Sequence, residues 1–193
     1  MTLTLFGSQT SPYVRRIRLV LAQQAYQFSR MNILDEQDRA ILSRYNPTYK
    51  IPMLLDDDTV IFDSGVIYRY LAGKLKFKAL GWYQENQLTV INAVNDSLVI
   101  LYQGSRSGFD MDEDRLLFNL QKERIAASLF VLEQQCEAGE FANWDYPAMA
   151  LYSLVDWILF RELIDMEAYP ALLAFQQQNS QQEAVAQTDP RLG

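Results

Sequence analysis

The pair Ser11-Pro12 follows a short apolar stretch and precedes a helical pattern. Serine before proline is typical of a helix start, with serine as the N-cap and proline in the first turn. A helix N-terminus offers N–H groups and the positive end of the helix dipole, so it stabilises an anion such as a thiolate. The Ser11 hydroxyl could donate a hydrogen bond to the sulfur of a bound thiol. Capping alone explains the same residues, and both interpretations stay open at this stage.

A second candidate segment, Lys50-Ile51-Pro52, stands at the start of an apolar stretch. Proline can begin a strand there because its missing N–H need not pair. A trans bond before Pro52 would make an ordinary turn. A cis bond would turn the Ile51 backbone outward, so that its N–H and C=O groups could bind a peptide as an added strand does.

The third segment is Asp63-Ser64, at a junction between a strand pattern and a helical pattern. Ser64 is a candidate N-cap, and Asp63 lies near the positive end of the helix dipole, so helix capping explains both residues. The two residues also suit a ligand that has both a positively charged amino group and a negatively charged carboxylate. Asp63 could accept hydrogen bonds from an amino group, while Ser64 and the following N–H could bind a carboxylate.

The elements that must position these segments alternate between strand and helix in the first third of the chain. Strand patterns cover 2–6, 28–33, 52–55 and 59–62, and helical patterns cover 12–25, 35–45 and 64–75. The first strand–helix–strand unit requires a right-handed parallel crossover, and the last two strands form an antiparallel hairpin. We therefore expect a four-stranded mixed sheet with helices on both faces.

The rest of the chain shows only helical periodicity. Helical patterns cover about 83–103, 112–138, 147–163 and 169–178, which indicates a helical bundle. We expect an α/β domain over 1–75, a linker over 76–83 and an all-α domain over 84–193.

The amino-acid composition excludes several kinds of catalytic site, metal site and cross-link. The chain has no histidine and a single cysteine, so it has no His-dependent triad, no His-rich metal site and no internal disulfide. Cys136 stands in an apolar helical stretch, and we expect an inert thiol and no metal. The net charge of -7 argues against nucleic acid, although Arg15, Arg16 and Arg18 form a local basic cluster. Without a signal peptide or a membrane-spanning run, we expect a cytoplasmic protein.

Taken together, the order and spacing of Ser11-Pro12-Tyr13, Lys50-Ile51-Pro52 and Asp63-Ser64 resemble the glutathione site of the glutathione transferase superfamily. The chain is most similar to bacterial members and the plant tau class, which carry this serine, and to relatives of stringent starvation protein A. Ser153-Leu154-Val155-Asp156 resembles the N-capping box that begins the central helix of the family's second domain. The resemblance implies a thioredoxin-like α/β N-terminal domain followed by an all-α bundle.

The resemblance also implies a role for each site residue. Ser11 would hydrogen-bond the glutathione sulfur, and Lys50 would lie near the glycine carboxylate. Ile51 would supply backbone bonds to the cysteinyl part, with Pro52 cis. Asp63 and Ser64 would hold the γ-glutamyl end. Most relatives have glutamate where this chain has Asp63, so the charge is kept on a shorter side chain.

The second substrate of such an enzyme would be a hydrophobic electrophile, bound between the domains as ligands often are. We expect Tyr13, Tyr102, Arg106 and Phe109 to line that pocket. The alternative is that these aromatic residues only pack the domains together.

Three functions are compatible with the resemblance. The first is a cytoplasmic, homodimeric transferase that uses glutathione as co-substrate and conjugates its thiolate to an electrophile in detoxification. The second is a non-catalytic interaction protein on the same fold, like stringent starvation protein A, which binds RNA polymerase. The third, a glutathione-dependent disulfide reductase, requires a cysteine where this chain has Ser11.

Overall fold

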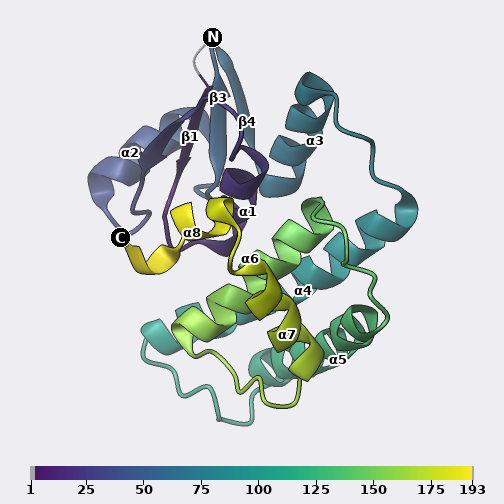
Figure 1. The fold of residues 1–193 in the computed structure, drawn as a ribbon. Helices are drawn as coiled ribbons and strands as arrows, with labels where there is room; N and C mark the ends of the chain where they lie inside the picture. Colours follow the sequence, from purple (N-terminus) through teal and green to yellow (C-terminus); the bar gives the residue numbers. More distant parts are fainter. Residues whose placement is uncertain (1–2, 193) are drawn as a thin grey trace. The chain divides into compact units, whose positions relative to one another are not determined.

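The computed structural model describes residues 3–192, and their contacts divide the chain into two compact units (Figure 1). The first unit contains the residues up to Ala79 and those from Gln181 onward, and the second is Leu80–Ser180. The sequence-based boundary placed everything from 84 onward in the helical domain. The residues from Gln181 onward instead make their contacts in the first unit, where side chains near the first helix bind their backbone.

The first unit has the predicted order of elements around a mixed sheet. Its elements are β1 (Leu3–Gly7), α1 (Pro12–Val20), β2 (Gln27–Arg30), α2 (Glu36–Tyr45), β3 (Met53–Asp56), β4 (Thr59–Phe62), α3 (Ser64–Leu75), α8 (Glu183–Gln187) and the 3₁₀ helix η1 (Pro190–Leu192). The strand order is β2-β1-β3-β4, with β1 parallel to β2 and the other two pairs antiparallel. The predicted thioredoxin-like fold is confirmed. Helix α1 ends at Val20, before the predicted end at 25, because the chain must turn to begin β2.

The two faces of the sheet carry separate apolar layers. Leu5, Leu54 and Ile61 are paired across β1, β3 and β4 and are buried on one face. Figure 1 shows α1 and α3 on that face and α2 on the other. Gly7 lies against α1 so closely that a Cβ atom would come within 2.4 Å of the Val14 side chain. A glycine there lets β1 and α1 approach.

The opposite face is covered by α2. Met31, Leu42 and Met53 form its buried cluster. The partly buried hydrophobic residues packed against this cluster are Phe6, Ile33, Ile51, Val60 and Phe62. Alternation of inward and outward side chains along each strand produces these two layers.

The second unit is helical, as predicted. Its helices are α4 (Trp82–Arg106), α5 (Leu116–Glu137), α6 (Tyr146–Arg161) and α7 (Pro170–Asn179). All residues of α6 from Tyr146 to Ile158 except Met149 are buried, so α6 is the core helix of this unit. Within 3–192, no helix is long and apolar enough to cross a membrane.

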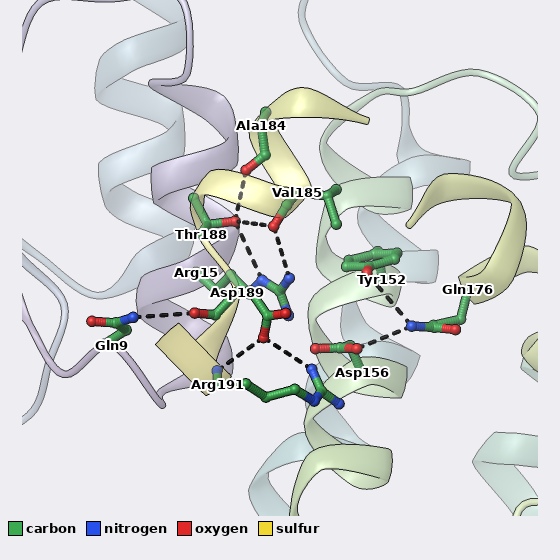
Figure 2. A network of polar contacts seen from close by, with 10 residues as sticks. All are labelled: Gln9, Arg15, Tyr152, Asp156, Gln176, Ala184, Val185, Thr188, Asp189 and Arg191. Carbon is green, nitrogen blue, oxygen red and sulfur yellow. Dashed lines mark hydrogen bonds and ion pairs between the residues drawn. The ribbon is translucent and has the colours of Figure 1, made fainter. Parts of the chain in front are cut away.

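The predicted capping box at Ser153 and Asp156 is wrong. Helix α6 begins at Tyr146, and the Asp145 side chain caps it by accepting a bond from Ala148 N–H at 3.2 Å. Ser153 lies inside the helix and donates to the Met149 carbonyl, while Asp156 accepts from the Gln176 amide at 3.0 Å (Figure 2). The aspartate cap and a proline in the first turn already provide a helix start before Ser153 is reached.

Candidate functional site

The three segments singled out in the sequence meet at one end of the sheet. Phe6 pairs with Met53, and Met53 pairs with Phe62, so these residues form one row across β1, β3 and β4. The Ser11 segment follows β1, the Lys50–Pro52 segment precedes β3, and the Asp63–Ser64 segment follows β4. Because β3 runs opposite to its neighbours, all three segments leave the same end of the sheet. The N-termini of α1 and α3 both lie at that end.

The loop before α1 is ordered by its own hydroxyl groups. Ser8 Oγ lies 3.1 Å from Thr10 Oγ1, and Thr10 N–H donates to Ser8 Oγ at 3.3 Å. Ser11 N–H donates to the Ser8 carbonyl at 3.2 Å. This serine–threonine turn sets the direction from which the chain enters α1.

Ser11 is the N-cap of α1, and its hydroxyl oxygen accepts a bond from Val14 N–H at 3.4 Å. The first turn of α1 contains no acidic residue. A hydroxyl that accepts one bond still has its own hydrogen to donate. Among residues 3–192, nothing accepts a bond from the Ser11 hydroxyl. Capping and thiolate binding are therefore compatible uses of one side chain, rather than alternatives.

Asn46 organises the loop that leads to Lys50 and Ile51. This asparagine is fully buried at the end of α2, and its Nδ2 donates to the Lys50 carbonyl at 2.8 Å. Its Oδ1 accepts from the backbone N–H and hydroxyl of Thr48. The bond between Ile51 and Pro52 is cis, as the resemblance predicted. The Lys50 side chain is exposed, so its ammonium can meet an anionic ligand.

Asp63, not Ser64, is the N-cap of α3. Its Oδ1 accepts from Gly65 N–H at 2.9 Å and Val66 N–H at 3.1 Å, and Oδ2 binds no other described residue. The φ angle of Asp63 is 73°, in a region that non-glycine residues seldom occupy. Backbone outliers of this kind concentrate at functional sites. Ser64 is the first residue of α3 and is 4% exposed.

The four residues predicted to line the electrophile pocket fall in both units. Tyr13 lies in α1, with the Arg16 guanidinium 4.9 Å from its ring centroid. Tyr102 lies in α4 and packs edge-on against Trp157, with 6.1 Å between ring centroids. Arg106 ends α4 and is exposed, and Phe109 packs against Phe118 at 6.4 Å. Their role as pocket walls stays a prediction.

The surroundings of the single cysteine, Cys136, favour its neutral thiol form. Burial, with Glu133 and Glu140 nearby, raises the pKa of the Cys136 thiol to about 12. A thiol with that pKa is almost entirely protonated near neutral pH. In the described part of the chain, no group of three or more acidic or cysteine side chains is arranged to hold a metal ion.

Two residues near the site were missed in the sequence. Asn46 directly follows the helical pattern over 35–45, and an asparagine at a helix end often binds the following backbone, as Asn46 does here. Gln9 donates from Nε2 to the Asp189 carbonyl at 3.1 Å. Those two residues are 180 positions apart, and no local signal in the sequence connects them.

Comparisons with known proteins found relatives of the N-terminal part and of the whole chain. Residues 5–75 match the family described as glutathione S-transferase, N-terminal domain. The crystal structure of a glutathione transferase family member from Pseudomonas fluorescens Pf-5, with bound glutathione, superposes with a TM-score of 0.80 at 25% identity. The similarity covers 98% of this chain and 99% of that chain. Residues 5–75 thus form a glutathione S-transferase N-terminal domain, and the chain as a whole has the glutathione transferase fold.

Two curated relatives show how far the similarity extends. The uncharacterized GST-like protein YibF of Escherichia coli (strain K12) is 26% identical over 96% of this chain and 98% of its own length. A stringent starvation protein A homolog of Histophilus somni is 33% identical over 69 residues, which are 36% of this chain and 32% of that protein. The glutathione S-transferase fold therefore spans the chain, and the match to the stringent starvation protein is confined to about a third of it.

Proposed function

We propose that this protein is a glutathione transferase that binds glutathione at the end of the sheet where α1 and α3 begin. Ser11 stabilises the glutathione thiolate, and the thiolate attacks a hydrophobic electrophile. With a chloro-dinitroaromatic compound, sulfur forms a bond to the ring carbon, chloride leaves with its electron pair, and the thiol proton passes to solvent.

The observation that carries this proposal is the state of the Ser11 hydroxyl. Its oxygen already caps α1, and its hydrogen is left to donate to a ligand at the positive end of that helix. A hydrogen bond to a charged acceptor contributes about 1.5–3 kcal/mol. That range corresponds to roughly one to two pH units in the pKa of the bound thiol. Most of the remaining acceleration comes from holding both reactants together.

The other two segments suit the remaining charges of glutathione. The exposed Lys50 ammonium is proposed to bind the glycine carboxylate, and the Ile51 backbone the cysteinyl part, with Pro52 fixing the turn. The unbound Oδ2 of Asp63 is proposed to accept the γ-glutamyl amino group, while the N-terminus of α3 at Ser64 receives its carboxylate. The glutathione bound in the Pseudomonas fluorescens relative supports this ligand.

Calorimetric titration with glutathione, followed by a conjugation assay with chloro-dinitrobenzene, tests the proposal. We expect saturable binding with a dissociation constant below the millimolar range, and turnover that depends on glutathione. No binding at millimolar glutathione would refute it. The assay should use reduced glutathione and, as a control, ophthalmic acid, which lacks the sulfur and should bind without turnover.

A second candidate is a non-catalytic interaction protein, favoured by the 69-residue match to the stringent starvation protein A homolog. This function predicts a stable protein partner and no glutathione binding. The same titration, combined with affinity capture from cell extract, separates the two candidates.

We further propose a cytoplasmic homodimer acting in detoxification. Leu116, Leu120 and Phe130 on α5 are 76%, 44% and 60% exposed, and exposed apolar side chains on one helix favour a protein interface. Light scattering should give twice the monomer mass. The monomer mass would contradict the dimer without bearing on glutathione binding.

A further inference from the structure

The last residues of the chain pack on α1 and on the loop that contains Ser11. Three side chains near the N-terminus donate to three backbone carbonyls of this C-terminal segment (Figure 2 shows the contacts of Gln9 and Arg15). The contacts are Gln9 Nε2 to the Asp189 carbonyl at 3.1 Å, Arg15 Nη2 to the Val185 carbonyl at 3.2 Å, and Arg18 Nη2 to the Gln187 carbonyl at 3.2 Å.

These contacts hold an element that cannot be stable alone. Helix α8 has five residues, and isolated helices of that length do not persist in water. The carbonyls of its last turn have no partner within the helix, and they lie at the negative end of its dipole. Arg15 and Arg18 donate from their guanidinium groups to the Val185 and Gln187 carbonyls, and Thr188 N–H also donates to the Val185 carbonyl. The basic cluster noted in the sequence therefore has a use that involves no nucleic acid.

The contact between α1 and the C-terminal segment is buried at Arg15. The Arg15 and Thr188 residues are 3% and 4% exposed, and Arg15 Nε donates to Thr188 Oγ1 at 3.4 Å. The Thr188 hydroxyl in turn donates to the Ala184 carbonyl at 2.8 Å. Buried polar groups that are satisfied in this way hold a single arrangement, because any displacement leaves donors without acceptors.

Gln9 connects this anchored segment to the thiolate loop. Gln9 lies between Ser8 and Thr10, whose hydroxyls order the loop, and two residues before Ser11. The Asp189 carbonyl that it binds is fixed from both sides, by α8 before it and by η1 after it. In addition, the Asp189 carboxylate accepts from Arg191 N–H at 2.9 Å and from Arg191 Nη1 at 3.1 Å. These two bonds fix the backbone immediately after the Asp189 carbonyl that Gln9 binds.

We propose that the C-terminal segment from Gln182 to Leu192 is a strut that sets the position of Ser11, and that Gln9 is the positioning residue that links the strut to the loop. The part of this inference that concerns turnover rests on the proposed function. Gln9 touches no reacting atom. It acts by keeping the Ser11 hydroxyl where a thiolate bound at the N-terminus of α1 can receive its hydrogen bond.

Two variants of Gln9 in the full chain test the link. Gln9→Met keeps the length of the side chain but removes the N–H donor, and Gln9→Lys restores a donor. Gln23→Met, at an exposed position after α1 with no hydrogen bond in the structure, is the matched control. The loss of one hydrogen bond corresponds to roughly a three- to tenfold change in an equilibrium.

The first measurement is amide hydrogen exchange over 10–14 without ligand. We expect exchange about three to ten times faster in Gln9→Met, recovery in Gln9→Lys, and no change in Gln23→Met. Unchanged exchange in Gln9→Met would overturn the proposal that the C-terminal segment positions the loop, whether or not the protein binds glutathione. If the wild-type protein binds no glutathione, the proposed function is refuted, and faster exchange still supports the strut.

The second measurement separates positioning from general loosening. Because Lys50, Ile51 and Asp63 remain to hold glutathione, Gln9→Met should lower kcat about three- to tenfold and change the KM for glutathione less than about twofold. Gln9→Lys should restore kcat. An unchanged kcat, or a loss that appears in KM alone, contradicts the positioning role.

Discussion

The hydroxyl oxygen of Ser11 accepts a hydrogen bond from the backbone N–H of Val14, 3.4 Å away, and no described residue accepts a bond from that same hydroxyl. One side chain thus begins a helix and keeps a donor for a ligand. The sequence alone presented capping and catalysis as competing uses of this serine. The chemistry of a hydroxyl group allows both at once.

Ser11→Ala should therefore impair both functions. Loss of the cap should lower the free energy of unfolding by about 1 kcal/mol. Loss of the hydrogen bond to sulfur should raise the pKa of bound glutathione, and conjugation below that pKa should fall about ten- to a hundredfold. Urea denaturation and conjugation rates measured from pH 6 to 9 check the two effects.

Ser11→Asp separates the two effects, because aspartate is a good cap but offers a negative charge in place of a donor. We expect a stability close to that of the wild type and almost no conjugation. Wild-type turnover in Ser11→Asp would show that the serine acts only as a cap.

Asp63→Asn removes a charge at the site while keeping the local structure. Asparagine can cap α3 and tolerates a positive φ better than most residues, so stability should change by less than about 0.5 kcal/mol. The dissociation constant for glutathione should rise about tenfold, because the amino group loses its ionic partner. Calorimetry on both proteins gives the ratio, and equal affinities would remove Asp63 from the site.

Glu133 on α5 caps α7 from outside that helix. Its two carboxylate oxygens accept from Ala171 N–H at 2.7 Å and Leu172 N–H at 2.9 Å, and the residue is 7% exposed. Glu133→Ala leaves two N–H groups without acceptors and should lower the free energy of unfolding by about 2–4 kcal/mol. The exposed Glu137 on the same helix is the control. Glu137→Ala should change the free energy of unfolding by less than about 0.5 kcal/mol. Similar midpoints of urea unfolding for the two variants would contradict this role.

Asp56 should make stability depend on pH in acid. Hydrogen bonds from Lys74 and Tyr70 hold the pKa of its carboxyl below the ordinary 3.8, although burial opposes the shift. A pKa that is lower in the folded state adds stability above the unfolded pKa, and that stability is lost as pH falls through the folded pKa. Asp56→Asn should therefore be less stable than wild type by about 1–2 kcal/mol at pH 6. The difference should shrink below about pH 4. The midpoints of urea unfolding between pH 6 and 3 measure this difference, and the exposed Asp58→Asn is the control. A stability difference between wild type and Asp56→Asn that stays the same over this pH range would contradict the role of Asp56.

Much of the fold could be predicted because its signals are local. The strand patterns over 2–6, 28–33, 52–55 and 59–62 each correspond to a strand of the sheet, and the predicted parallel crossover and antiparallel hairpin are both present. The helical pattern over 147–163 agrees with α6, but the capping box predicted at Ser153 and Asp156 is wrong, because both residues are buried inside the helix. Spacing does not distinguish a cap from two polar residues that bind Met149 and Gln176 in a core.

The site was predictable where its residues bind their own neighbours in the chain. Ser11 was predicted as the cap of α1 and is that cap, whereas the predicted cap of α3, Ser64, is its first residue and the preceding Asp63 is the cap. The contacts of Gln9 and Arg15 with the residues after Gln182 were not predictable, because they join the two ends of the chain. Helix α8 was missed for the same reason: its five residues show no periodicity, and contacts with α1 stabilise it.

A crystal structure of the protein with glutathione tests the central claim most directly. We predict the glutathione sulfur within about 3.5 Å of Ser11 Oγ, at the N-terminus of α1, with the γ-glutamyl end at Asp63 and Ser64. A sulfur bound elsewhere, or a Ser11 hydroxyl that donates to the protein's own backbone while glutathione is present, would contradict the account.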